Sequence, residues 1–341
     1  MRRHVLTAGE PFTFECGKKL EGIRIVYHTS DRDYTPGEKV VWICHALTGN
    51  SNPEDWWPQM VGAGKLIDPE KYYVVCAAML CSPYGECGPA SIDPSTGRPY
   101  FLSFPRTTVR DITAADILVR KHLGINKIDL LIGPSIGGFQ AVEWTVMEPS
   151  VIERAVFLAT DVRVAPFLTA FNESQRLALL ADQSFGEAAS LDGGRAGLEC
   201  ARSIALISYR TFDGYNLTQA EQEEDTIFAD RAASYQRYQG VKLVRRAFDA
   251  YSYYYLSLAL DSMNVGRGRG GVAAALATIE AKCYVICITS DVLFPPDRCR
   301  AAAEAIPFAE YWEINSIFGH DGFLIENDQL TGILSDIDFF K

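Results

Sequence analysis

Residues 130–138, LLIGPSIGG, decide how the rest of the chain is interpreted. The mostly apolar run from Ile128 to Ile132 predicts a buried strand. Gly133 then allows the backbone to turn sharply, and Ser135 follows at the apex of the turn. The run from Phe139 to Met147 predicts a helix packed beneath the turn.

This order of strand, tight turn, exposed serine and helix is the G-x-S-x-G nucleophile elbow of α/β-hydrolases. A serine hydroxyl is a weak nucleophile until a base takes its proton and hydrogen-bond donors stabilise the oxyanion that forms. The turn would present the Ser135 hydroxyl and direct the backbone N–H of Ile136 at that oxyanion. A glycine-rich loop with a chance serine is the alternative, but the motif here has its required context. We therefore predict the α/β-hydrolase fold, with a mostly parallel sheet of about eight strands.

The order of the catalytic residues along the chain selects the partners of the serine. In this fold the order is serine, acid and histidine, and His320 is the one histidine of five that follows Ser135. Asp291 comes just after the apolar run Lys282 to Thr289, where this fold carries its acid, and a helix cap is its alternative role. Asp161 also follows a strand-like run and is the second candidate. We predict a Ser135–Asp291–His320 triad.

The segment HALTGN at 45–50 supplies a candidate for the second oxyanion donor. It follows the apolar run Val40 to Cys44, which predicts a buried parallel strand. In α/β-hydrolases the loop after this strand provides a backbone N–H to the oxyanion. Leu47 is our candidate for that donor, with the neighbouring amides as alternatives. His45 precedes the serine, so it does not fit the chain order expected of the base.

The pattern of apolar residues divides the chain into a core and an insertion. Between about 165 and 265, helical periodicity replaces the alternation of strands and helices, with apolar runs at 171–180, 197–209, 229–238 and 241–263. We interpret this segment as a helical cap, residues 165–265, over a core built from residues 1–164 and 266–341. Near the N-terminus, Phe12 to Cys16 and Ile23 to His28 predict an antiparallel hairpin at a sheet edge.

Composition excludes several classes of protein. The net charge of −11 and the pI of about 5.0 argue against a surface for nucleic acid or acidic membranes. No apolar run is long enough to span a membrane, and the N-terminus lacks the apolar region of a signal peptide. The nine cysteines form no zinc-binding spacing, so we expect reduced thiols in a cytoplasmic protein and no metal site. Residues 266–271 fit G-x-G-x-x-G by spacing but follow a helical run, so we predict no dinucleotide site.

Several segments in one fixed order resemble the homoserine O-acetyltransferase family, a group of α/β-hydrolase-fold acyltransferases. They are HALTG at 45–49, GPAS at 88–91, SIGG at 135–138 with Gln140-Ala141 and Glu143-Trp144, Ala201-Arg202, Tyr209-Arg210, RYQG at 237–240, GRGRGG at 266–271, Ser290-Asp291, LFPP at 293–296 and Gly319-His320-Asp321. The resemblance runs from about residue 40 to the C-terminus. Pro134 and Ile136 depart from it, because the family usually has Gly and Met there.

The resemblance implies a reaction in two steps, belonging to methionine biosynthesis. Ser135 takes an acyl group from an acyl-CoA, expected to be acetyl-CoA, and the hydroxyl of L-homoserine then attacks the acyl-serine with His320 as base. It also implies that Arg202, Tyr209 and Asp321 reach the pocket. A guanidinium suits a carboxylate, and an aspartate suits an α-ammonium, so an amino-acid acceptor would use both. No permanently bound cofactor and a homodimer formed through the cap are further implications.

The loop CSPYGEC at 81–87 differs from the usual glycine- and serine-rich form of the family. If this loop lines the pocket, the identity of the acyl donor and the identity of the acceptor both stay open. The alternatives are therefore a serine or homoserine O-succinyltransferase, or a carboxylesterase or thioesterase on the same fold. An esterase would not need the pair of Arg202 and Asp321.

Overall fold

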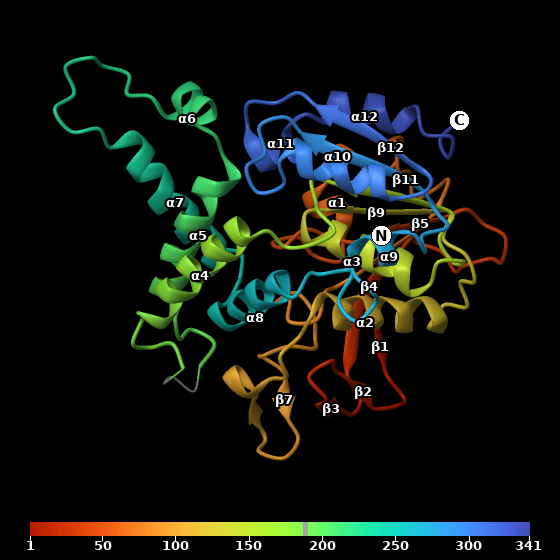
Figure 1. Ribbon diagram of the computed structural model, residues 1–341. Helices are drawn as coiled ribbons and strands as arrows, with labels where there is room; N and C mark the ends of the chain where they lie inside the picture. Colours follow the sequence, from red (N-terminus) through yellow and green to blue (C-terminus); the bar gives the residue numbers. More distant parts are fainter. Residues whose placement is uncertain (187–189) are drawn as a thin grey trace.

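The computed structural model describes residues 1–186 and 190–341 of the chain (Figure 1). Its centre is an eight-stranded sheet in the order β1-β4-β6-β5-β9-β10-β11-β12. These strands are β1 (Arg2–Thr7), β4 (Arg24–Thr29), β5 (Val40–Ile43), β6 (Tyr73–Ala77), β9 (Leu130–Pro134), β10 (Arg154–Leu158), β11 (Lys282–Ile288) and β12 (Ala309–Ile314). β1 and β4 are antiparallel to their neighbours, and the strands from β6 to β12 run parallel. The predicted α/β-hydrolase fold and its mostly parallel sheet are confirmed.

Apolar side chains cover both faces of this sheet. Along β5, Val40 and Trp42 belong to one core cluster while Val41 and Ile43 belong to the other, and all four are 0% exposed. Successive side chains of a strand point to opposite faces, so a strand covered on both sides is an unbroken apolar run. The first face carries α2 (Val109–His122), α3 (Ile136–Met147) and α10 (Pro296–Ala305), and the second carries α1 (Pro53–Trp56) and α12 (Asn327–Ser335).

The predicted N-terminal hairpin is wrong. Strand β4 pairs with β1 at the very N-terminus, and Phe12 to Cys16 does not reach it. Instead β2 (Phe12–Thr13) and β3 (Lys19–Leu20) form a separate small ribbon, as do β7 (Ile92–Asp93) and β8 (Arg98–Pro99). β1 is an edge strand that is only half-buried, and it tolerates charged residues such as Arg2 and Arg3. It therefore lacks the apolar run that marks the central strands.

Five helices occupy residues 166–261, and no strand lies between them in the described part of that segment. They are α4 (Pro166–Leu180), α5 (Arg195–Tyr209), α6 (Phe212–Gln219), α7 (Arg231–Arg245) and α8 (Ala250–Asp261). In Figure 1, α4 to α7 stand away from the layered core, with α8 at their junction with it. The expected helix over 241–263 is wrong, because α7 ends at Arg245 and Asp249 caps α8 by accepting from the Ser252 N–H at 2.8 Å.

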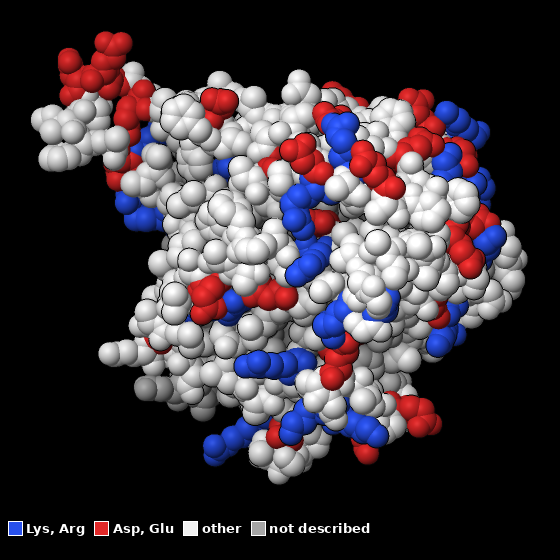
Figure 2. Space-filling view, viewed as in Figure 1, with Lys and Arg blue, Asp and Glu red and all other residues white. Residues whose placement is uncertain are grey.

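The remaining short helices lie at the return to the core and near the C-terminus. They are α9 (Val272–Leu276) and α11 (Gly322–Ile325), with single 3₁₀ turns at Phe101–Ser103 and Gly319–Asp321. No helix of the described chain has the length and apolarity needed to cross a membrane. Figure 2 shows charges of both signs over the core, and acidic side chains gathered at the tip of the projecting helices, where α6 connects to α7.

Candidate active site

Ser135 lies in the sharp turn between β9 and α3, with φ 58° and ψ −123°. This backbone conformation is unfavourable for any residue with a side chain. Hydrogen bonds to the neighbouring strand hold it in place. The Ser135 N–H donates to the Leu158 carbonyl at 3.0 Å, and the Thr160 hydroxyl donates to the Ser135 carbonyl at 2.9 Å. The end of β10 thus fixes the turn that presents the serine.

Two glycines of the motif are required by the close approach of other backbone atoms. A Cβ at Gly133 would lie 2.1 Å from the Gly137 carbonyl oxygen, and a Cβ at Gly137 would lie 2.1 Å from the Cys44 carbonyl oxygen. Both distances are far below van der Waals contact. The turn can therefore fold back on itself at Gly133, and pass close to the residue after β5 at Gly137, only when neither position carries a side chain.

The structure brings Ser135, His320 and Asp291 into one chain of contacts. His320 Nε2 lies 2.9 Å from Ser135 Oγ, and His320 Nδ1 lies 2.7 Å from Asp291 Oδ2. The second oxygen of Asp291 accepts the N–H groups of Leu293 and Phe294 at 2.8 and 3.1 Å. Because a carboxylate accepts at Nδ1, the ring proton resides there and Nε2 is left to accept the serine proton.

Burial and charge act in opposite directions on His320. The ring is only 4% exposed. Burial alone lowers the pKa of His320, but the charge and hydrogen bond of Asp291, helped by the charge of Asp321, outweigh it. The pKa of His320 is therefore raised above its ordinary value. A raised pKa means that the site favours the imidazolium that forms when the serine loses its proton.

The second candidate acid has other partners. Asp161 accepts the backbone N–H of Val162 at 2.7 Å with one oxygen and pairs with Arg298 through the other. Among the described residues it makes no contact with His320. Asp291, the first candidate, is the carboxylate that the structure brings to the histidine.

His45 lies close to the elbow but is engaged on both ring nitrogens. Its Nε2 accepts the Met79 N–H at 3.1 Å, so Nδ1 carries the proton and donates to the Ala46 carbonyl at 2.9 Å. Burial lowers the pKa of His45 to about 4, so the ring is neutral near pH 7. In a trans peptide the carbonyl and the next N–H point in opposite directions. His45 therefore orients the Leu47 N–H away from its own ring, a role that the sequence did not indicate.

One predicted oxyanion donor, Leu47, shares a cavity with Ser135, and the other, Ile136, directly follows Ser135 in the chain. Leu47 and Ser135 line the same cavity, and the Leu47 N–H has no acceptor within the described part of the chain. Ile136 is the first residue of α3, where a backbone N–H has no acceptor within its own helix. A helix N-terminus also favours negative charge. Both N–H groups are available to a developing oxyanion.

The cavity above Ser135 has a volume of about 220 Å³. Its lining residues are Ala46, Leu47, Thr48, Ser135, Arg202, Leu206, Tyr209, Arg210, Gln239, Lys242, Arg246, His320, Asp321, Phe323 and Leu324. All three predicted substrate-binding residues are among them. The Arg202 guanidinium lies 5.4 Å from the Tyr209 ring centroid, and the rings of Tyr209 and His320 are 5.7 Å apart. Asp321 forms an ion pair with Arg210 at 3.0 Å.

Comparison with known proteins agrees with this geometry. Residues 39–326 match the family model described as the alpha/beta hydrolase fold. A curated homoserine O-acetyltransferase from Cyclobacterium marinum is 40% identical, covering 98% of this chain and 94% of that protein. This chain belongs to the homoserine O-acetyltransferase family. A solved homoserine O-acetyltransferase from Staphylococcus aureus is 29% identical with a TM-score of 0.80, covering 100% of this chain and 97% of that one.

The fold alone does not separate this family from esterases. A solved acetylester hydrolase from Corynebacterium glutamicum superposes with a TM-score of 0.85 at 22% identity, covering 98% of this chain and 95% of that one. An identity this low shows a shared fold and nothing more. The features that separate a transferase of this family from an esterase must therefore lie in the residues around the serine.

Three cations of the cavity have no predicted role from the sequence. Arg210 is next to Tyr209 in a segment that resembles the family, but its pairing with Asp321 depends on the fold. Lys242 and Arg246 have a spacing of four residues near the end of α7, a pattern common on any exposed helix. Their place in the cavity emerges only from the packing of α7 against α5.

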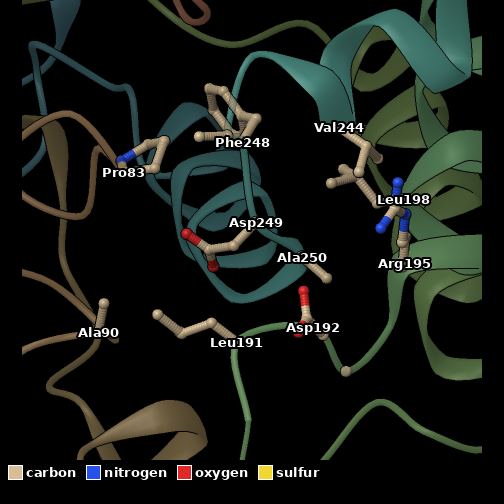
Figure 3. A pocket seen from close by; sticks show the side chains of 12 residues that line it. Pro83, Ala90, Leu191, Asp192, Arg195, Leu198, Val244, Phe248, Asp249 and Ala250 are labelled. Carbon is tan, nitrogen blue, oxygen red and sulfur yellow. The ribbon is translucent and has the colours of Figure 1, made fainter.

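The divergent loop 81–87 does not line the catalytic cavity within the described chain. Its Pro83 faces a neighbouring cavity of about 310 Å³, together with Phe248 and Leu191 (Figure 3). The loop meets the helices through Tyr84, whose ring packs edge-on against Phe248 at 5.8 Å. Its unusual sequence therefore bears on the contact between core and helices rather than on the pocket beside Ser135.

Proposed function

We propose that this protein transfers an acetyl group from acetyl-CoA to the hydroxyl of L-homoserine, a step of methionine biosynthesis. One observation carries the proposal. The contact chain of Ser135, His320 and Asp291 opens into a cavity that also holds a guanidinium, Arg202, with no carboxylate partner among the described residues, and a carboxylate, Asp321. An esterase needs the first part, whereas an amino-acid acceptor needs the second as well.

In the first half-reaction His320 takes the Ser135 proton while Oγ attacks the thioester carbonyl. The backbone N–H groups of Leu47 and Ile136 stabilise the oxyanion, an effect worth about 3 kcal/mol for one donor in comparable sites. The tetrahedral intermediate expels the CoA thiolate, which receives the proton from His320. Asp291 keeps the ring in the required tautomer throughout, because its carboxylate accepts at Nδ1.

In the second half-reaction the homoserine hydroxyl replaces the leaving thiol. Arg202 binds its carboxylate and Asp321 binds its ammonium, while Arg210 fixes the orientation of Asp321. The Tyr209 ring contacts both Arg202 and His320, so it limits the positions open to the acceptor. His320 takes the acceptor's proton, the hydroxyl oxygen attacks the acetyl carbonyl, and Ser135 recovers its proton as it leaves.

The decisive test separates a transferase from a hydrolase, since both form the same acyl-serine. We expect that without an acceptor the enzyme releases about one equivalent of CoA per active site and then turns over slowly. Homoserine should restore continuous release, because a positioned hydroxyl is worth several kcal/mol over water, on the order of other oriented reactants. Stopped-flow detection of free thiol measures both phases. Fast, steady release that homoserine leaves unchanged would make the protein a thioesterase or esterase.

The covalent intermediate has its own test. After brief exposure to acetyl-CoA, intact-mass analysis should show one acetyl adduct on the wild-type protein and none on Ser135→Ala. An adduct of equal yield on the alanine variant would place the nucleophile elsewhere.

The identity of donor and acceptor is tested by a panel. We expect kcat/KM to be highest for acetyl-CoA with homoserine, and lower for succinyl-CoA or for serine. Serine is one methylene shorter, so its hydroxyl would not reach His320 while Arg202 and Asp321 hold its other groups. A preference for succinyl-CoA or for serine would select one of the two related transferases instead.

We further propose a cytoplasmic homodimer that binds no permanent cofactor, with acyl-CoA as a co-substrate. All nine cysteines are free thiols, as expected in a reducing compartment. No group of three metal-ligating side chains occurs within residues 1–186 and 190–341. The helices over 165–265 act as a cap over the serine and as the surface through which two copies associate.

A further inference from the structure

Two cations in the catalytic cavity have no carboxylate partner among the described residues. Lys242 and Arg246 line it together with Ser135, and neither lies within 4.0 Å of a carboxylate in the described chain. Of the other two cations of the lining, Arg210 pairs with Asp321 and Arg202 packs on the Tyr209 ring. Lys242 also lies over an aromatic ring, 6.0 Å from the centroid of Tyr238, but this contact does not neutralise its charge. The chain as a whole carries a net charge of −11. A small cavity with unpaired positive charge in an acidic protein attracts anions.

The two cations point the same way because of their spacing on one helix. Gln239, Lys242 and Arg246 are separated by three and four residues, so they share one face of α7, and all three line the cavity. The end of this helix is fixed to the core, because the Tyr84 hydroxyl donates to the Arg246 carbonyl at 3.0 Å. The position of this positive surface relative to Ser135 is therefore set by the fold.

A purely helical role does not explain this placement. Cations in the last turn of a helix interact favourably with its dipole, and Arg245 occupies the same turn. Arg245 is exposed but does not line the cavity, whereas Lys242 and Arg246 do. The dipole accounts for basic residues in this turn and leaves unexplained why two of them face the site.

We propose that Lys242 and Arg246 bind the phosphate groups of the acyl donor, which under the proposed function is acetyl-CoA. Guanidinium and ammonium groups are the usual protein partners of phosphate. Both side chains are exposed, while His320 is buried, so they lie at the solvent side of the cavity. The phosphates would stay at this mouth while the acyl thioester reaches inward to Ser135. The site thereby selects a phosphorylated donor over small acetyl esters and thioesters.

The test compares a donor with phosphates and a donor without them. Acetyl-CoA and S-acetyl-N-acetylcysteamine present the same acetyl thioester, and only the first carries phosphate. The ratio of their kcat/KM values should fall about tenfold in Lys242→Ala and in Arg246→Ala, as expected for a charge-assisted contact. Arg245→Ala removes a cation from the same helical turn, outside the cavity, and should leave the ratio within about twofold of wild type.

Salt gives a second measurement. The KM for acetyl-CoA should rise with KCl in the wild type and much less in the Lys242→Ala/Arg246→Ala double variant, because exposed charges are screened. A donor ratio that changes no more than in Arg245→Ala, or an unchanged salt response in the double variant, would overturn the proposal. Failure of the phosphate site can be told apart from failure of the proposed function. Acetyl transfer to homoserine by the wild type, with no change of donor ratio in the variants, would reject only the phosphate site.

Discussion

Ser135 occupies a backbone conformation that costs about 1–3 kcal/mol for a residue with a side chain. The cost is tolerated because neighbouring atoms leave the turn no alternative. The backbone of β5 lies against Gly137, and Thr160 holds the Ser135 carbonyl. The strain therefore serves to raise the hydroxyl above the sheet edge, where His320 reaches it. Catalytic geometry and close packing depend on the same few atoms here.

Gly137→Ala tests this dependence. Its Cβ would lie 2.1 Å from the Cys44 carbonyl oxygen, so β5 and α3 would have to separate. We expect a loss of roughly 3 kcal/mol in the free energy of unfolding, measured by urea denaturation. Gly332→Ala on α12 is the control, because its Cβ would meet nothing within 4 Å. Equal stability of the two variants would contradict the close-packing argument.

The raised pKa of His320 predicts the pH dependence of acylation. The neutral ring accepts the serine proton, so the rate falls as the pH drops through the pKa of His320, at a midpoint above the ordinary range of a histidine. Asp291→Asn removes the charge that raises this pKa, so the midpoint should move to lower pH while turnover falls by about 10⁴-fold. The pH profile of CoA release measures both. Asp328→Asn, an exposed carboxylate on α12, should leave the midpoint in place.

Under the proposed function, Arg202 binds the carboxylate of the acceptor. Arg202→Ala should raise the KM for homoserine about ten- to a hundredfold, because a charge-assisted contact in a partly buried site is worth about 1.5–3 kcal/mol. The burst of CoA in the first half-reaction should keep its amplitude. Arg195→Ala removes a guanidinium from the same helix, outside the catalytic cavity. Equal loss in both half-reactions of Arg202→Ala would mean that Arg202 does not act on the acceptor.

Sequence alone could select Ser135, His320 and Asp291, because a local motif and the chain order of the fold constrain them. It could not identify the roles of His45 and Arg210. His45 contacts Met79, and Arg210 contacts Asp321 more than a hundred residues away. Neither pairing leaves a periodic or spaced pattern in the sequence. Residues that orient other residues emerge only when distant segments are brought together.

The segment between α5 and α6 joins the projecting helices to the loop that carries His320. A Cβ at Gly319, which has φ +65°, would lie 2.9 Å from the Tyr209 carbonyl oxygen. The Thr211 hydroxyl donates to the Ile317 carbonyl. Thr211 Oγ1 also accepts the Gly214 N–H, so Thr211 is the N-cap of α6. The histidine loop is therefore held from both sides, by Ser290 just after β11, whose hydroxyl accepts the Gly319 N–H, and by the segment between α5 and α6.

Thr211→Val tests this junction. It removes the N-cap of α6 and leaves the Ile317 carbonyl without its donor, so we expect a loss of about 1–2 kcal/mol in stability and a lower kcat. Thr218→Val is the matched control, since its hydroxyl donates to the Gly214 carbonyl within α6 and makes no other hydrogen bond in the described chain. Thermal denaturation and steady-state assays give the two readouts. A Thr211→Val enzyme with the stability and kcat of Thr218→Val would show that the junction does not support the histidine.

The sequence predicts a helix or strand best where the element is buried. The central strands were recognisable as apolar runs because both of their faces are covered. Edge strand β1 was missed because half of its surface is exposed. The boundary between α7 and α8 was missed because the apolar periodicity continues across it. The break depends on Ala247, which has a positive φ of 58°, and on the Asp249 cap, and neither interrupts the hydrophobic pattern.

The segment with the projecting helices and the loops between them carries most of the exposed large apolar side chains of the described chain. Among the described residues, ten of the seventeen exposed large apolar side chains lie between residues 167 and 238. They include Ile207 on α5, 57% exposed, and Leu217 on α6, 67% exposed. These helices stand away from the sheet in Figure 1 and offer surface to a second molecule. Apolar exposure concentrated in one region marks an interaction surface.

The proposed homodimer predicts a particle of twice the 37.8 kDa chain in light scattering coupled to size exclusion. A two-fold axis places the same surface on both partners, so one substitution disrupts the interface twice. Ile207→Asp should therefore yield a folded monomer, because it introduces two charges into an interface that must bury about 800 Å² on each partner. Phe308→Asp is the control, since Phe308 is 63% exposed on the core, far along the chain from these helices. A wild type that elutes as a monomer at micromolar concentration would refute the dimer. Dissociation by Phe308→Asp, with Ile207→Asp still dimeric, would place the interface on the core.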